Sequence, residues 1–471
     1  MVKKRPTVGF MAIGLHSYWG QFEGMKEKCL HQHEVMKEKF DCRDIRLEDA
    51  GIVDSEDLAR ETGKMFREKK VDIVFCHMLT YAASVYIAPV MRELDASMIL
   101  LNVQWGKSLD YDNVKGLGDW LGEGITCAGI PEATAVLRTL KKSYGIVTGY
   151  MEDKSVEQEI KEWCRAVSVK KKLAEGNLAL FGRSFAGMMD LCVNETKIFE
   201  KFGTYIHHLD WQEIVDAGKT ASSDQIEKEM QKIREIFEIN EDMTEQDVRC
   251  IAETAEGFRK LAGEYNLHSI AGHYEFDAPE SQADLLAAMN PALTILMTEG
   301  TGYAPEGDIR AALAMVILKE LAGSAMMAEL YSMDFNDDTC LVGHSGACDA
   351  AISSEKAVLK KGIFHGKKGT GYVTQFYPDK GPVTMLALTE DENGEYYLAA
   401  AEGECVDGPV LMLGDTNLRA KFPGGVKKFV NAWSMEGPTH HGVLAKGHHI
   451  SELKRVADIL RIPLKVIGAE D

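Results

Sequence analysis

The chain has 471 residues, of which 45% are hydrophobic and 27% charged, and its formal net charge is −20. These fractions are those of a globular protein of about three domains, which excludes a disordered, collagen-like or coiled-coil chain. The acidic balance argues against nucleic acid or an anionic membrane surface as a partner.

The N-terminus does not have the features of a secretory signal. Residues 1–6 are basic, but the apolar stretch after them is short, contains Gly9 and Gly14, and lacks a small-residue cleavage site. No segment is long and apolar enough to suggest a membrane span. Ten cysteines occur without a CxxC pair, which gives no sign of a zinc knuckle or a disulfide framework. We therefore expect a cytoplasmic protein with no membrane span.

The first third of the chain alternates short apolar runs with longer amphipathic segments. The expected strands are at 8–13, 71–76, 97–101 and 144–147. The expected surface helices are at 55–69 and 152–172. This alternation predicts a parallel sheet covered by helices, a doubly wound α/β domain.

The middle of the chain begins a second alternating segment with a strand at 178–181 and a helical stretch from 223 to about 263. Further on, we expect Asn290 and Pro291 to open a helix that Gly300 closes. A long helix then starts near Ile309, and we expect the next helix to carry Glu329.

The last third is rich in glycine and β-branched residues, which predicts strands. These strands are expected at 369–376, 383–388 and 396–401, before a final helix at 451–460 and a strand at 463–467. The predicted fold class is therefore α/β, with doubly wound N-terminal (1–175) and middle (176–325) domains and a β-rich C-terminal domain (326–471).

Two short motifs point to other enzyme classes. The segment Gly343-His344-Ser345-Gly346-Ala347 nearly matches the GxSxG nucleophile elbow, but its last glycine is replaced and it lies in the β-rich part. The glycines between 300 and 307 lack the spacing of a dinucleotide loop. We therefore expect neither a serine hydrolase nor a nucleotide-binding site.

Carboxylates and imidazoles form a more coherent set. Glu306 stands just ahead of a predicted helix, Glu329 follows, His344 ends an apolar run, and His440-His441 lie in a glycine-flanked segment. These donors suit a borderline-hard divalent metal such as Mn²⁺, Fe²⁺ or Co²⁺. Spacing alone does not separate such a site from solvated surface glutamates.

Four segments together resemble a known family. Residues 302–308, 329–331, 341–344 and 439–441 are similar, in order and approximate separation, to the metal-site motifs of the L-arabinose isomerase/L-fucose isomerase family, in its arabinose isomerase-like branch. The resemblance implies three domains and a divalent metal, with Mn²⁺ as the expected ion. It also implies a homo-oligomer, commonly a hexamer, in which the first domain of a neighbouring subunit closes the site.

The family pattern gives each residue a role. Glu306 and Glu329 would be metal ligands and also the acid/base pair, and His344 and His441 would complete the coordination. Because consecutive residues on an extended strand point to opposite sides, we expect only one of His440 and His441 to face the metal. The family pattern favours His441 and leaves His440 beside the substrate or in a structural role.

Other residues are candidates for substrate contacts. Asp308 either orients a ligand or a substrate hydroxyl, or is an ordinary helix-start carboxylate. Loop residues His16 and Gln104 resemble substrate-contact positions of the family. Phe185 and Met188 stand where the family places apolar residues that line the substrate pocket. They are explained equally well as side chains of the hydrophobic core.

The resemblance predicts an activity but not a particular sugar. We expect a metal-dependent aldose–ketose isomerase that acts on a pentose, a hexose or a modified sugar through an enediolate, with two glutamates moving protons. Arabinose-specific members carry a glutamine where this chain has His16, so L-arabinose does not follow as the substrate. The alternative is a non-catalytic cytoplasmic sugar-binding or regulatory protein on the same fold.

Overall fold

The computed structural model describes residues 5–41, 43–122, 126–273, 280–363 and 370–468. The chain forms two compact units. The first unit comprises Val2–Lys171 and Asp458–Arg461, and the second comprises mainly Lys172–Ala457 and Ile462–Asp471. Helices α7 (Lys154–Glu175) and α15 (Ile450–Leu460) contribute residues to both. The three-domain division with boundaries at 175 and 325 stays a prediction.

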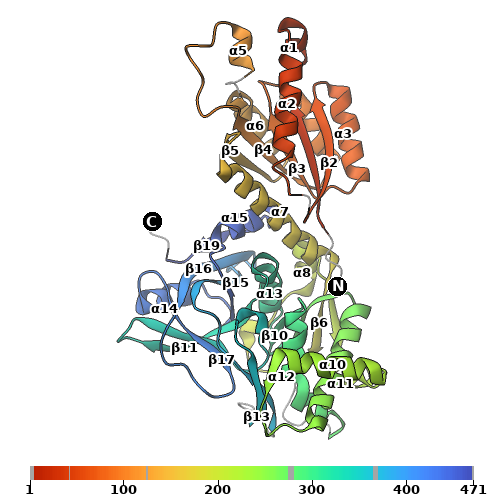
Figure 1. The fold of residues 1–471 in the computed structure, drawn as a ribbon, viewed down its shortest axis with the longest axis vertical. Helices are drawn as coiled ribbons and strands as arrows, with labels where there is room; N and C mark the ends of the chain where they lie inside the picture. Colours follow the sequence, from red (N-terminus) through yellow and green to blue (C-terminus); the bar gives the residue numbers. More distant parts are fainter. Residues whose placement is uncertain (1–4, 42, 123–125, 274–279, 364–369, 469–471) are drawn as a thin grey trace. The chain divides into compact units, whose positions relative to one another are not determined.

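The described part of the first unit contains a five-stranded parallel sheet in the order β2-β1-β3-β4-β5 (Figure 1). Its strands are β1 (Thr7–Ile13), β2 (Arg46–Val53), β3 (Ile73–Met78), β4 (Ser97–Gln104) and β5 (Tyr144–Tyr150). Every residue of β1 and β3 is buried, as the apolar runs of a covered parallel sheet require. The parallel α/β arrangement is confirmed, and its doubly wound covering stays a prediction.

Helices connect these strands. Besides α7 they are α1 (His16–Gln21), α2 (Met25–Lys37), α3 (Glu56–Glu68), α4 (Ala88–Arg92), α5 (Leu117–Leu121) and α6 (Ile130–Thr139). Helix α3 begins where the Ser55 hydroxyl accepts a hydrogen bond from the Leu58 N–H, and its inner face buries Ala59 and Phe66. The expected helices at 55–69 and 152–172 correspond to α3 and α7.

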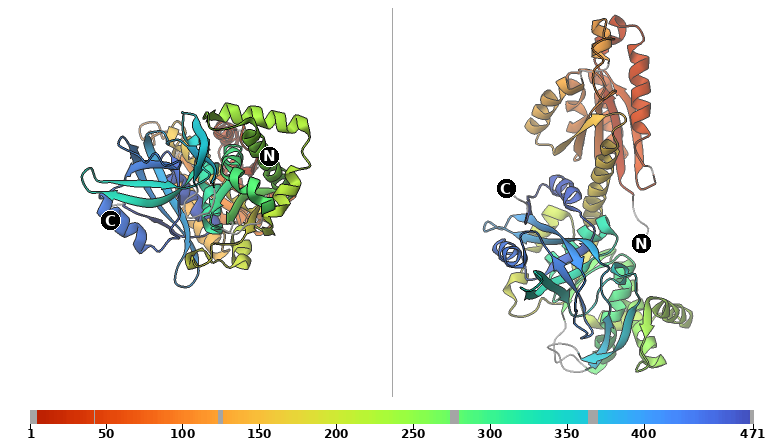
Figure 2. Two further views of the ribbon diagram at one scale, coloured as in Figure 1. Left: turned by 90° about the horizontal axis from the view of Figure 1, so that it is seen from below. Right: turned by 60° about the vertical axis from the view of Figure 1, so that its left-hand side comes forward.

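The described part of the second unit contains three sheets. A parallel sheet has the order β10-β9-β6-β7, a small sheet has the order β14-β13-β8, and a seven-stranded, mostly antiparallel sheet has the order β15-β18-β11-β12-β17-β16-β19. In both views of Figure 2 the blue strands of the largest sheet and the light green helical segment lie on opposite sides of this unit.

The elements of the second unit have the following bounds. The strands of the first two sheets are β6 (Asn177–Gly182), β7 (Ile206–Leu209), β8 (Phe237–Ile239), β9 (Leu267–His273), β10 (Gly302–Pro305), β13 (Ala357–Ile363) and β14 (Thr370–Gln375). The largest sheet contains β11 (Met326–Asp334), β12 (Thr339–His344), β15 (Gly381–Glu390), β16 (Tyr396–Val406), β17 (Thr416–Lys421), β18 (Gly442–Lys446) and β19 (Leu464–Val466). The helices are α8 (Glu195–Phe202), α9 (Trp211–Gly218), α10 (Ser223–Ile236), α11 (Glu245–Glu264), α12 (Ala283–Thr298), α13 (Ile309–Ala322) and α14 (Val426–Met435).

The prediction that Asn290 and Pro291 open a helix is wrong. Helix α12 begins at Ala283 and carries Pro291 in its interior. A proline there removes one backbone hydrogen bond and crowds the preceding turn. The second half of α12 is almost entirely buried, so tertiary packing, from which most helices in proteins derive their stability, offsets this cost.

The prediction that a helix carries Glu329 is also wrong. Glu329 lies on strand β11, although Met, Ala, Glu and Leu in this segment are good helix formers. Strand β11 pairs with β12 on one side and with β18 on the other. Two ladders of backbone hydrogen bonds thus override the local preference, as sheet context commonly does.

Helix α13 packs between two sheets. It contacts β9 and β10 of the parallel sheet and β15 and β18 of the seven-stranded sheet, and nearly all of its side chains are buried. The ammonium group of Lys319 is buried on this helix, where it donates to the Met297 carbonyl at 2.7 Å and pairs with the Asp349 carboxylate. Over the described residues, no helix has both the length and the apolar character needed to cross a bilayer.

Replacing Lys319 by Met should leave the fully buried Asp349 carboxylate without its charge partner. We expect the free energy of unfolding to fall by about 3–5 kcal/mol, which is the cost of removing one partner of a buried ion pair. Urea unfolding followed by circular dichroism measures this change. The matched Lys427→Met variant, at an exposed position of α14, should stay within about 0.5 kcal/mol of the wild type. Equal stability of the two variants would contradict the assignment.

Candidate functional site

Strand pairing brings three of the predicted residues side by side around β11 of the seven-stranded sheet. Strand β11 pairs with β12, which places Glu329 opposite Gly343, and with β18, which places the preceding residue opposite Gly442. His344 follows Gly343 and His441 precedes Gly442, so both histidines lie next to Glu329. The Nε2 atom of His344 is 3.9 Å from the Glu329 carboxylate.

Glu306 reaches the same place from the loop between β10 and α13. Its φ is 61°, a left-handed conformation that is uncommon for a residue with a side chain. The Phe185 N–H donates to the Glu306 carbonyl at 2.9 Å, and the Ser184 hydroxyl donates to the Gly307 carbonyl at 2.9 Å. Gly307 has φ 73°, and a Cβ there would lie 2.6 Å from Ser184 Cα. The two segments therefore fix the backbone of Glu306.

The two carboxylates and three imidazoles form one cluster. The Glu306 carboxylate is 3.6 Å from His441 Nε2 and 3.4 Å from His440 Nε2, and Glu329 is 3.8 Å from His440 Nε2. Ligand atoms of Glu306, His344 and His441 lie within 4.8 Å of one another, as do those of Glu329, His440 and His441. The structure thus brings together all four residues expected as ligands, and His440 with them.

The protonation pattern of His344 and His441 suits a cation. His344 Nδ1 is 2.6 Å from the Ser345 carbonyl, which only accepts, so this nitrogen carries the proton. His441 Nδ1 donates to the Asp308 carboxylate at 3.0 Å. The two Nε2 atoms face each other at 3.2 Å, and burial lowers the pKa of His344 to about 4. Two acceptor nitrogens at this distance repel unless a proton or a cation lies between them, and the donor set therefore fits a divalent metal.

The structure brings both His440 and His441 to the cluster, and the prediction that only one of them faces the metal stays a prediction. The two rings lie 4.0 Å apart with an angle of 38° between their planes, and both approach Glu306. The pair stands in a bend before β18 and not on an extended strand, so the alternation of side chains does not apply. His441 is fully buried, whereas the side chain of His440 is 36% exposed.

Asp308 contacts both the start of helix α13 and His441. Its Oδ1 accepts a hydrogen bond from the Ala311 N–H at the start of α13, and its Oδ2 binds His441. It is completely buried. Such a partner fixes the tautomer and the ring orientation of a histidine ligand.

Asp190 was not foreseen in the sequence. Its carboxylate accepts from the Nδ1 and the backbone N–H of His440, at 2.7 and 3.1 Å, and its own carbonyl accepts a hydrogen bond from Arg310. The hydrogen bond to Glu306 and the carboxylate of Asp190 raise the pKa of His440 to about 9. Burial raises the pKa of Glu306, but the hydrogen bond from His440 and the other imidazoles outweigh it, so the net direction is downward.

The expected substrate contacts belong to two different units of the chain. Phe185 is half-buried and packs against His273, with ring centroids 4.4 Å apart and an angle of 43° between the ring planes. Met188 is half-buried in the same segment. His16 and Gln104 belong to the first unit, where His16 lies 3.4 Å from Asp54. Gln104 donates to the Gly106 carbonyl at 2.8 Å. Their roles toward a substrate stay predictions.

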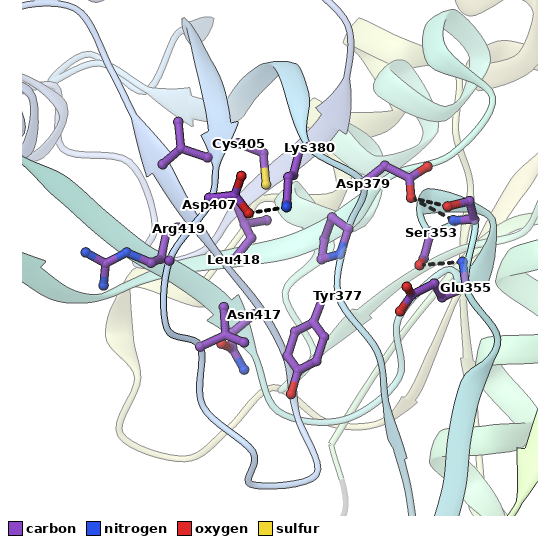
Figure 3. A pocket seen from close by; sticks show the side chains of 15 residues that line it. Ser353, Glu355, Tyr377, Asp379, Lys380, Cys405, Asp407, Asn417, Leu418 and Arg419 are labelled. Carbon is purple, nitrogen blue, oxygen red and sulfur yellow. Dashed lines mark hydrogen bonds and ion pairs between the residues drawn. The ribbon is translucent and has the colours of Figure 1, made fainter. Parts of the chain in front are cut away.

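Two cavities of similar size occur among the described residues of the second unit. One, of about 320 Å³, has Glu306 and His344 in its wall. The other, of about 410 Å³, contains none of the predicted site residues. Figure 3 shows that the carboxylate of Asp407 in this second cavity faces Lys380, with which it forms an ion pair. The smaller cavity is therefore the candidate for ligand binding.

Replacing Asp190 by Asn should lower the pKa of His440, because it removes a negative charge at hydrogen-bond distance. The pKa of His440 in the folded protein lies above that of a free imidazole. Its stabilising contribution is therefore present below about pH 6.5 and is lost as the pH rises through about 9. NMR titration of ¹³C-labelled histidines in the metal-free protein measures the shift. An unchanged His440 titration in the variant would contradict the assignment.

The comparisons with known proteins point to one class of enzyme. No family model matches the chain. The L-arabinose isomerase of Saccharophagus degradans is 22% identical over 396 residues, covering 81% of this chain and 77% of the relative. The sulfoquinovose isomerase of Priestia aryabhattai is 21% identical over 399 residues, covering 83% and 85%. A solved substrate-binding protein from Clostridium difficile gives a TM-score of only 0.16 at 9% identity, over 64% of this chain and 74% of its own. Over about four fifths of its length, this chain is thus similar to sugar isomerases that act on L-arabinose or sulfoquinovose by name.

Proposed function

We propose that this protein is a divalent-metal-dependent aldose–ketose isomerase. Glu306, Glu329, His344 and His441 would hold the ion. The observation that carries the proposal is the pair of Nε2 atoms facing each other at 3.2 Å between two carboxylates. The similarity to sugar isomerases supports it independently. Because the donors are oxygen and imidazole nitrogen, a borderline-hard ion such as Mn²⁺ is the proposed metal.

The reaction requires removal of a proton from a carbon next to a carbonyl. When bound, a divalent ion supplies Lewis-acid polarisation of neighbouring sugar oxygens, which acidifies that C–H bond. In our proposal, one of Glu306 and Glu329 takes the proton from carbon, and the other exchanges a proton with the sugar oxygen. General acid/base steps of this kind typically contribute about a hundredfold to ten-thousandfold.

His440 would support both glutamates. Its Nε2 lies 3.4 Å from Glu306 and 3.8 Å from Glu329, and Asp190 holds the opposite side of the ring. A protonated imidazole in this position donates to the Glu306 carboxylate and lowers its pKa, and it places a positive charge near Glu329. It therefore orients the pair before the sugar binds, which favours a fast proton transfer.

We also propose where the enzyme acts, how it assembles and which kind of sugar it uses. The resemblance implies a homo-oligomer, in which His16 and Gln104 from a neighbouring copy would reach the sugar, and the sequence favours a cytoplasmic protein. The substrate would be a small aldose. The relatives leave two kinds of substrate open, because one group is named for the neutral sugar L-arabinose and the other for a sulfonated sugar.

The proposal is tested by incubating the purified protein with Mn²⁺ and a panel of aldoses in D₂O. We expect a ketose product that carries deuterium at the carbon next to the carbonyl. The Glu306→Gln variant should lose at least about a hundredfold in kcat with an unchanged thermal melting temperature. Binding of sugars without turnover of any would favour the non-catalytic alternative, and a fully active variant would contradict the role of Glu306.

Replacing Asp308 by Asn separates its two roles. Asparagine is as good a helix N-cap as aspartate, so we expect the melting temperature to change little. With the amide oxygen at the Ala311 N–H, the amide NH2 group faces His441 Nδ1 and cannot accept its proton, so the affinity for Mn²⁺ should fall about tenfold to a hundredfold. Calorimetric titration with Mn²⁺ measures this affinity. Wild-type affinity in the variant would show that Asp308 serves only the helix.

A further inference from the structure

The cavity beside Glu306 and His344 has a polar wall that the metal cluster does not use. Besides these two residues, Asn290, Ser345 and Asp415 line it. Its volume of about 320 Å³ lies at the lower end of the range of about 300–1,000 Å³ for small-molecule sites. A monosaccharide is a ligand of suitable size.

Strand register places Ser345 and Asp415 together. Strands β12 and β17 are antiparallel, with His344 opposite Thr416, so the next residue of one strand meets the preceding residue of the other. The Ser345 hydroxyl donates to the Asp415 carboxylate at 2.7 Å. The Gly414 N–H donates to the Gln375 side chain at 3.0 Å, which fixes the segment before Asp415. The carboxylate is therefore held in the cavity wall by the same sheet that carries His344.

Asn290 supplies a second and independent indication of a ligand. It is only 8% exposed, it lines the cavity, and no residue within the described ranges is hydrogen-bonded to its side chain. A Cβ on Gly346 would lie 3.3 Å from Asn290 Oδ1, so a larger residue there would crowd the amide. The amide opens onto the cavity, where the hydroxyl group of a bound compound would hydrogen-bond to it.

We propose that Asn290, Ser345 and Asp415 form a hydroxyl-binding subsite for the non-reacting part of a neutral aldose, and that the Asp415 carboxylate disfavours anionic sugars. This inference rests on the proposed function, since it assigns the substrate class of that site. A carboxylate and an amide both accept hydrogen bonds from sugar hydroxyls. A sulfonate or a carboxylate on the sugar would add a like charge beside Asp415, which is not among the proposed metal ligands.

The experiment compares neutral aldoses with sulfoquinovose and D-glucuronate on the Mn²⁺-loaded protein, by turnover and by equilibrium binding calorimetry. We expect the best neutral aldose to exceed both anionic sugars at least about tenfold in kcat/KM and in binding affinity. Asp415→Asn should raise the KM for the neutral sugar about tenfold, with a smaller change in kcat. It should also reduce the ratio of kcat/KM between the neutral aldose and the anionic sugars. Asp407→Asn, in the other cavity, is the matched control and should leave both values unchanged.

Asn290→Ala distinguishes ligand binding from a structural role. Because the amide has no partner among the described residues, its removal should leave the melting temperature equal or higher, while the KM rises. A lower melting temperature with unchanged sugar affinity would overturn the subsite, as would a preference for an anionic sugar. Binding of neutral sugars through Asp415 without any turnover would leave this inference standing and count against the proposed function.

Discussion

The candidate site depends on one buried carboxylate. Asp308 caps helix α13 through the Ala311 N–H and holds the Nδ1 proton of His441. The helix lies between two sheets, and the loop just before it delivers Glu306. A single side chain thus sets the start of the helix and the tautomer of a histidine from the far end of the sequence. The position of Glu306 relative to His441 follows from that link.

Charge is the second constraint on this region. The chain is strongly acidic, and several carboxylates gather around three imidazoles. The site limits their mutual repulsion in two ways. Asp190 and Glu306 share the protonated His440, and Asp308 faces the N–H of His441. The Nε2 lone pairs of His344 and His441 are directed at each other, and only a proton or a cation between them relieves their repulsion.

Local periodicity was enough to predict some of these features. The alternation of strands and helices in the first unit, the apolar run that ends at His344 and the helix near Ile309 all depend on hydrophobic patterns within short windows. Glu329 and Pro291 were misassigned because pairing of β11 with two neighbours and burial of α12 override local preference. Long-range packing decides such cases.

The supporting residues of the site could not be predicted for the same reason. Asp190 meets His440 across 250 positions of the chain, and Ser345 meets Asp415 across 70. Neither aspartate stands in a motif with a recognisable spacing. Sequence order shows which residue types are present, but the register of β12 and β17 and the contact of the Asp190 segment with Arg310 exist only in the folded chain.

The left-handed backbone conformation of Glu306 costs folding free energy, whereas the carboxylate that this residue carries is needed for the proposed reaction. Glycine adopts this conformation at no steric cost, whereas a residue with a Cβ is strained by about 1 kcal/mol or more. Selection for a robust fold alone would therefore favour glycine at position 306, next to the glycine already present at 307. A glutamate there means that the carboxylate is retained at the expense of folding free energy, and a stabilising screen of this protein should recover glycine at this position together with loss of turnover.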